Sequence, residues 1–109
     1  MDPVTTAFTT FEESVPTALD ALDAGAVLAR QSAILIKPNL INASPPPITT
    51  PVACVEAVIN YVREHSAAAI VVGEGCGDAQ LETDDVFQRL GYTEMAGRLN
   101  VELVDLNRA

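Results

Sequence analysis

Residues Ala33–Pro51 read AILIKPNLINASPPPITTP, and this stretch decides the fold. Four apolar residues lead directly into Lys37, Pro38 and Asn39, which predicts a strand that ends in a polar turn. The proline run at 45–47 continues neither a strand nor a helix, so the loop is expected to be extended and stiff. Thr50 and Pro51 then suit the N-cap and the first position of a helix.

Apolar residues at helical spacing predict two longer helices, over 14–23 and 52–65. In the first, Ser14 is the expected N-cap and Gly25 the expected stop. Thr10 and Glu13 also match a capping box, but a start there would place Pro16 inside the helix, so Ser14 is preferred. Shorter helices are expected from 83, with Thr83 as cap, and over 94–99.

Three segments, 33–37, 69–73 and 101–105, predict strands. The first is apolar without alternation, so it is expected to be buried on both faces. Because helices alternate with these strands, the fold class expected is α/β, with a mainly parallel sheet of three or four strands and flanking helices. The arrangement is Rossmann-like, in two or three layers. A length of 109 residues suits a single domain, 1–109.

Charge and cysteine content restrict the possible partners and setting. The formal net charge is −9, so nucleic acid and anionic membranes are not expected partners. No run approaches the ~18 apolar residues of a membrane span, and the N-terminus lacks a signal-peptide pattern. The two cysteines, Cys54 and Cys76, form no Cys-x-x-Cys pair, so both are expected to be reduced in a cytoplasmic protein.

The polar residues that follow the strands are the candidate site, since parallel strands bring their carboxyl ends to one edge. Lys37, Glu74 and Asp105 are the candidate catalytic residues. Asn39 and three glycines are the candidate cofactor-binding residues, namely Gly73, Gly75 and Gly77. A structural ion pair between Lys37 and a carboxylate is the competing interpretation, as is the ordinary polarity of loops.

The glycine-rich segment after the second strand has two further interpretations. The dinucleotide fingerprint needs a glycine where Asp78 stands, and no Gly-Lys-Ser/Thr follows, so nucleotide binding is not favoured. Glu74 and Asp78 could instead hold a divalent cation such as magnesium or calcium. A tight turn that requires positive φ would also explain the glycines.

Several blocks in order resemble the domain of unknown function 362 family: ILIKPN, PPPITTP with VEAVINYV, VVGEGCG, VFQRLGY and VELVDLN, spanning Ile34–Asn107. The family is largely uncharacterised, and many members carry iron–sulfur cysteine runs, which implies a redox association for some of them. Two separated cysteines assemble no iron–sulfur cluster from this chain alone, and Cys76 stands where the family more often has serine. The family domain is longer, so we expect the N-terminal part of a larger fold.

Three functions therefore remain open. The first is an enzyme that uses the strand-end residues, with the redox link that the family resemblance implies. The second is a module that binds a small molecule or an ion. The third is a non-catalytic structural or interaction half-domain. The expected partners of the half-domain are a second copy of the chain or the C-terminal part of the family domain, because a three-stranded sheet leaves an unpaired edge.

Overall fold

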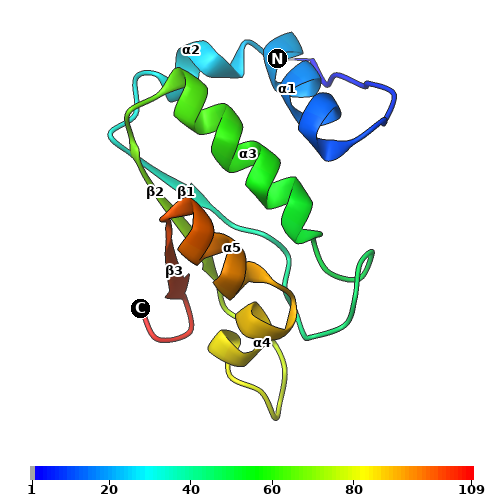
Figure 1. Cartoon of the computed structure of the whole chain (residues 1–109), viewed down its shortest axis with the longest axis vertical. Coiled ribbons are helices and arrows are strands. Elements are labelled where there is room, and N and C mark those ends of the chain that lie inside the picture. The colour runs from blue at the N-terminus through cyan, green and yellow to red at the C-terminus, as the bar shows by residue number, and fades with distance from the viewer. Residues whose placement is uncertain (1) are drawn as a thin grey trace. The chain divides into compact units, whose positions relative to one another are not determined.

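The computed structural model describes residues 2–109. Figure 1 shows its elements, which in chain order are α1 (Phe11–Ala21), α2 (Ala24–Leu28), β1 (Ala33–Ile36), α3 (Val52–His65), β2 (Ala69–Glu74), α4 (Thr83–Arg89), α5 (Tyr92–Leu99) and β3 (Glu102–Asp105). The chain forms two compact units. The helical unit contains the residues up to Ile34 and Ala53–Ala69, and the sheet unit contains Leu35–Val52 and Ile70–Ala109.

The three strands form one parallel sheet in the order β1-β2-β3. β2 pairs with β3 in a register that runs from Val71 opposite Glu102 to Glu74 opposite Asp105. The predicted α/β class, the strand positions and the parallel direction are therefore confirmed. β1 and β3 are the two edge strands, and β2 is paired on both sides.

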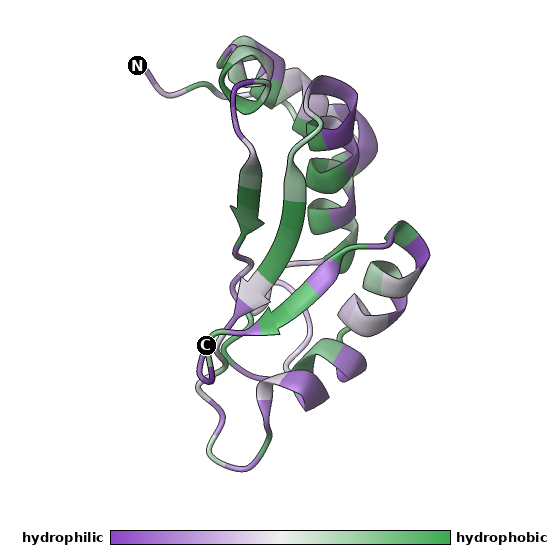
Figure 2. Ribbon diagram, turned by 90° about the vertical axis from the view of Figure 1, so that its left-hand side faces the viewer, coloured by the Kyte–Doolittle hydropathy of each residue, from purple (hydrophilic) through white to green (hydrophobic). Residues whose placement is uncertain are grey.

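The sequence predicts that the strand at 33–37 is buried on both faces. This prediction is wrong, because Leu35 of β1 is 55% exposed. In the sheet unit, the side chains of Leu35 and Leu106 approach the position where a Cβ of Gly73 would stand, at 3.0 and 3.2 Å. Because side chains alternate along a strand, the neighbouring Val72 points to the opposite face, and it is fully buried. α5 contacts β3, and Figure 2 shows α4 and α5 on one side of the β2–β3 pair.

Helix α1 starts at Phe11 with Thr10 as its N-cap, so the predicted start at Ser14 is wrong and the alternative start at Thr10 is right. The Thr10 hydroxyl accepts a hydrogen bond from the Glu13 N–H at 3.1 Å. Ser14 cannot serve as the cap because its own N–H already donates to the Thr10 carbonyl, at 2.7 Å. Pro16 consequently lies inside the helix, and the hydrogen bonds of the first turn outweigh its cost.

Gly25 does not stop α1, contrary to the prediction, but lies within α2. The left-handed residue between the two helices is Asp23, at φ 55°. Gly25 has a different role, because a Cβ there would collide with the imidazole ring of His65. That ring stacks on Tyr61 with centroids 4.2 Å apart, and the Tyr61 hydroxyl donates to Asp20 at 2.7 Å. The close packing of the His65 ring against the backbone of α2 is thus possible only because residue 25 is a glycine.

The α4–α5 segment follows the predicted pattern with shifted ends. α4 begins at Thr83, and its N-cap is Glu82, whose N–H donates to Asp85 at 3.1 Å. The prediction of Thr83 as the cap is wrong because its hydroxyl accepts from the Cys76 N–H instead. Gly91 separates α4 from α5 at φ 87°, a conformation that favours glycine. Within residues 2–109, no helix combines the length and apolar character that a membrane crossing requires.

Two isoleucines of different burial test this description. Ile59 in α3 is fully buried, whereas Ile48 is 56% exposed. We expect Ile59→Ala to lower the free energy of unfolding by about 2–5 kcal/mol, since it removes buried methyl groups and leaves a cavity. Ile48→Ala, the same chemical change at the surface, is expected to cost less than about 0.5 kcal/mol. Urea unfolding of both variants measures the difference, and equal losses would contradict the assigned burial.

Candidate functional site

The carboxyl ends of the strands carry the candidate residues in the sheet unit. Lys37 follows the last residue of β1, Glu74 ends β2 and Asp105 ends β3. Glu74 and Asp105 are directly opposite in the parallel register. The sequence reasoning therefore placed these three residues at the same edge of the sheet, as the topology requires.

Glu74 is the centre of this edge. Its side chain is only 5% exposed, and Oε1 lies 2.7 Å from Lys37 Nζ. Oε1 also accepts a hydrogen bond from the Gly75 N–H at 3.1 Å, and Oε2 accepts one from the Leu40 N–H at 2.8 Å. We call Lys37, Glu74 and these two backbone N–H groups the strand-end cluster. It ties the loop after β1 to the end of β2.

The charge of Glu74 is stabilised despite its burial. Burial by itself raises the pKa of this carboxyl, because removal from water disfavours the charged form. The hydrogen bonds from Lys37, Leu40 and Gly75 act in the opposite direction and prevail, so the pKa of Glu74 lies below its ordinary value of 4.5. Glu74 is therefore an ionised hydrogen-bond acceptor at neutral pH, and it is poorly suited to act as a general acid.

Lys37 has a different environment from its partner. Its side chain is 58% exposed, although the ammonium is fixed against Glu74. An ammonium group carries three N–H donors. The strand-end cluster therefore presents a positioned positive charge to solvent at the edge of the sheet where ligands bind in open α/β proteins.

Asn39, a predicted cofactor-binding residue, closes the loop after β1. Its N–H donates to the Thr50 hydroxyl at 2.9 Å, and its carbonyl accepts from the Thr50 N–H at 3.0 Å. The Tyr92 hydroxyl donates to the Thr50 carbonyl at 2.6 Å, and the buried Thr49 hydroxyl donates to the Ser44 carbonyl at 2.7 Å. Asn39 thus fixes the conformation of the loop after Lys37 through its backbone hydrogen bonds with Thr50.

Two of the three predicted glycines, Gly73 and Gly75, accommodate close neighbours, whereas a Cβ at Gly77 would make only ordinary contacts with Ile41. Within residues 2–109 the glycine with positive φ is Gly91, so a turn that needs positive φ does not explain Gly73, Gly75 or Gly77. A Cβ at Gly75 would collide with the Asn107 side chain, whose amide donates to the Cys76 carbonyl at 3.0 Å. Because Gly75 has no side chain, Asn107, the second residue after β3, can approach and bind the loop that follows β2.

Asp105 and Asp78 are engaged away from the strand-end cluster. Asp105 Oδ1 accepts from the Asn107 N–H at 2.9 Å, and Oδ2 lies 3.6 Å from Arg108 Nε. Asp78 Oδ1 accepts from the N–H groups of Gln80 and Leu81, at 2.8 and 2.9 Å, and these bonds lower the pKa of its carboxyl. Among residues 2–109, no group of three or more His, Cys, Asp or Glu side chains is arranged to hold a metal ion.

Both cysteines are free thiols in the structure. Burial raises the pKa of the Cys54 thiol, which disfavours the reactive thiolate. Cys76 is buried, and its sulfur lies 3.5 Å from the Leu81 carbonyl.

Sequence reasoning missed Leu40, Thr83 and Asn107, which hold this edge together. Leu40 acts through its backbone N–H and Thr83 through a buried hydroxyl, and neither contact has a sequence signal. Asn107 lies in the block VELVDLN, just after the third predicted strand, and this position at the polar end of a strand was the sequence feature that could have indicated its role.

Comparison with known proteins identifies the family. A family model described as Domain of unknown function (DUF362) matches residues 34–109, which is more than half of the chain. The resemblance inferred from the sequence blocks is confirmed. No curated protein and no solved structure matches the chain.

Removal of the Glu74 charge tests the strand-end cluster. We expect Glu74→Gln to lower the free energy of unfolding at pH 7 by about 1–3 kcal/mol, because charge-assisted hydrogen bonds are lost. Since the folded-state pKa of Glu74 is lowered, its contribution is complete above the ordinary value of 4.5 and is lost as the pH falls through the folded-state pKa. The difference between wild type and variant should therefore shrink in acid.

Urea unfolding between pH 7 and pH 3 measures this difference. Glu94→Gln is the matched control, because the Glu94 side chain is 72% exposed and pairs with Arg98 along α5. Such a pair contributes about 0.2–0.5 kcal/mol. A loss in Glu74→Gln no larger than in Glu94→Gln would contradict the role assigned to Glu74.

Proposed function

We propose a function from the premise that the chain belongs to the DUF362 family, which is defined only as a domain of unknown function. The strand-end cluster binds a small anionic ligand through a carboxylate or phosphate group, with Lys37 as the anchoring cation and Glu74 as the group that positions it. The observation that carries this proposal is that Lys37 is held by a buried carboxylate while 58% of its side chain faces solvent.

Charge distribution within the cluster supports an anion as the ligand. Two backbone N–H groups, from Leu40 and Gly75, share the negative charge of Glu74 with the ammonium. Lys37 is therefore not the sole partner of that charge and retains donors for a second anion. Because its ammonium is already positioned, less side-chain entropy is lost when a ligand binds.

The other predicted site residues support binding more than catalysis. Glu74 accepts three polar contacts and Asp105 is directed to Asn107 and Arg108. The Asp78 carboxylate is held by its own loop. A divalent cation at Glu74 would compete with the Lys37 ammonium and two backbone N–H groups for the same carboxylate, so the anion at Lys37 is the better-supported ligand.

Lys37 is the only lysine in the sequence, which allows a direct test. Reductive methylation with ¹³C-formaldehyde labels Lys37 and the N-terminal amine and keeps both charges. We expect the Lys37 methyl signal to shift saturably with inorganic phosphate or with succinate, at a concentration below about 10 mM. The two titrations distinguish a phosphate ligand from a carboxylate ligand.

The N-terminal amine in the same sample controls for non-specific effects of salt. In the same titrations, the amide signals of Leu40 and Gly75 are expected to shift saturably. Lys37→Met keeps the apolar stem of the side chain and is expected to abolish these amide shifts. A Lys37 signal that moves no more than the N-terminal signal would refute the proposal. A variant that still responds to both anions would do the same.

A second candidate function, an interaction half-domain, is favoured by the exposure of Leu35. This leucine lies on edge strand β1 and is 55% exposed. An edge strand presents unpaired backbone groups, and two identical edges complement each other around a two-fold axis. The partner in this candidate is a second copy of the chain.

Sedimentation equilibrium tests this candidate over protein concentrations from about 10 to 200 μM, the range of weak association. We expect a reversible dimer that Leu35→Thr weakens, because the change removes apolar area at the edge and preserves strand propensity. Val27→Thr is the control, since Val27 is 44% exposed in the helical unit. A monomer at every concentration, or equal effects of both variants, would end this candidate.

A further inference from the structure

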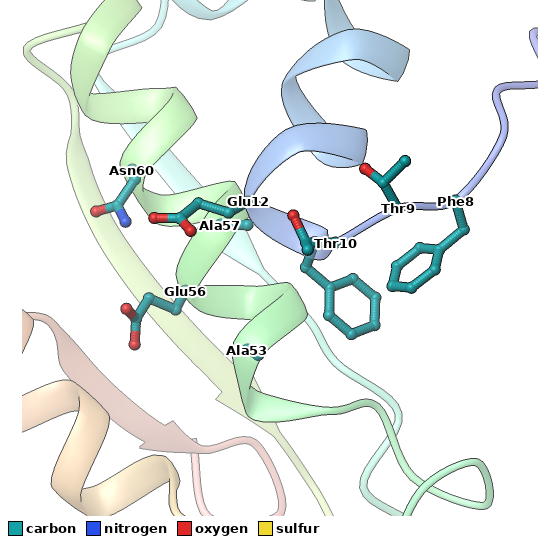
Figure 3. A pocket seen from close by; sticks show the side chains of 9 residues that line it. Phe8, Thr9, Thr10, Glu12, Ala53, Glu56, Ala57 and Asn60 are labelled. Atoms are coloured by element: carbon teal, nitrogen blue, oxygen red, sulfur yellow. The ribbon is translucent and has the colours of Figure 1, made fainter.

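A hollow on the helical unit lies between the start of α1 and helix α3. Its volume is about 460 Å³. Figure 3 shows this groove, whose principal lining side chains are Phe8, Phe11, Glu12, Ala53, Ala57 and Asn60. Ligand pockets commonly have volumes of about 300–1,000 Å³, so the groove has room for several side chains of a bound segment. It is separate from the strand-end cluster, which belongs to the sheet unit.

An aromatic pair forms one wall of the groove. The rings of Phe8 and Phe11 meet edge to face, with centroids 5.0 Å apart. Phe8 is nevertheless 63% exposed, the largest exposed fraction among the apolar side chains that are exposed in residues 2–109. The ring therefore offers a large apolar surface that the described residues do not cover.

The segment that carries Phe8 is fixed by hydrogen bonds. The Thr9 N–H donates to the Ser14 hydroxyl at 2.9 Å, and the Thr9 hydroxyl donates to Glu13 at 3.1 Å. Thr10 caps the helix that follows. Because Thr9 and Thr10 are tied to the first turn of α1, the adjacent ring of Phe8 is preorganised, and less conformational entropy is lost on binding.

The charged residues of this groove are acidic. Glu12 from α1 and Glu56 from α3 are the two charged residues in its lining. Figure 3 shows the Glu12 carboxylate directed across the groove to α3, where Ala57 and Asn60 lie. A net charge of −9 adds a long-range attraction for basic partners.

We propose that this groove, which we call the α1–α3 groove, docks a peptide segment of a partner protein that carries a lysine or arginine beside an apolar side chain. The apolar side chain packs on Phe8, Phe11 and the alanines of α3. The cation lies against the Glu12 carboxylate, which attracts its opposite charge. Charge complementarity selects this occupant over an acidic or purely apolar segment.

Selection from a phage-displayed library of random dodecapeptides on the full chain tests the proposal. We expect the recovered peptides to be net basic and to contain an aromatic or aliphatic residue next to the cation. In fluorescence polarisation with a synthetic copy of a recovered peptide, Phe8→Ala should weaken binding at least about tenfold, as expected for an aromatic anchor. Glu12→Gln should weaken it about two- to fivefold, with a steeper loss at low salt.

Two variants in the sheet unit provide matched controls. Ile48→Ala removes an exposed apolar side chain and Glu102→Gln removes an exposed charge, and both should leave the affinity unchanged within twofold. Thermal unfolding of all four variants identifies any loss that is due to misfolding. If Phe8→Ala fails to fold, Phe8→Leu, which keeps apolar volume without the ring, takes its place with the same expected direction.

Several results would overturn the proposal. These are recovery of no peptide above the bare matrix, recovery of neutral or acidic peptides, or binding that Phe8→Ala and Glu12→Gln leave unchanged. Self-association of the chain that Phe8→Ala abolishes would assign the groove to a second copy and would equally overturn it.

Discussion

The buried carboxylate of Glu74 is the constraint on which the sheet unit depends. A carboxylate this deeply buried stays ionised only if hydrogen bonds or an opposite charge stabilise it. Three groups do so: the Lys37 ammonium and the N–H groups of Leu40 and Gly75. Since these groups come from the ends of two neighbouring strands, the requirement of one side chain fixes the path of both following loops.

The rest of that edge is arranged around the same loops. Asn39 and Thr50 bond to each other across the proline-rich segment, and Tyr92 from α5 reaches the Thr50 carbonyl. On the other side, Asn107 and Thr83 hold the backbone of Cys76. Gly75 of the loop 75–77 is therefore explained by packing. The loop is narrow enough for Asn107 to approach, and its N–H groups form hydrogen bonds within the protein.

The two proposed binding surfaces use opposite charges in an acidic chain. At the strand ends, a single lysine is held in place by a carboxylate that is itself shared with backbone donors. The α1–α3 groove is lined by two glutamates and by an exposed aromatic ring, that of Phe8. A small anion suits the first surface and a basic segment suits the second, so the net charge of −9 alone does not describe what the protein attracts.

The sequence by itself determined the fold class, the three strands, helix α3, the family, and the meeting of Lys37, Glu74 and Asp105 at one edge. These follow from local apolar periodicity and from the rule that parallel strands end on the same side. Only the tertiary structure decided that Glu74, and not Asp105, binds Lys37, since β2 and not β3 lies beside β1 in the sheet. It also decided that α1 starts at Phe11 with Thr10 as its N-cap, that Leu35 on an edge strand is exposed, and that Gly75 and Gly25 make room for Asn107 and His65. The start of α1 depends on local hydrogen bonds. The other features depend on contacts between residues far apart in the chain, which spacing along the sequence does not record.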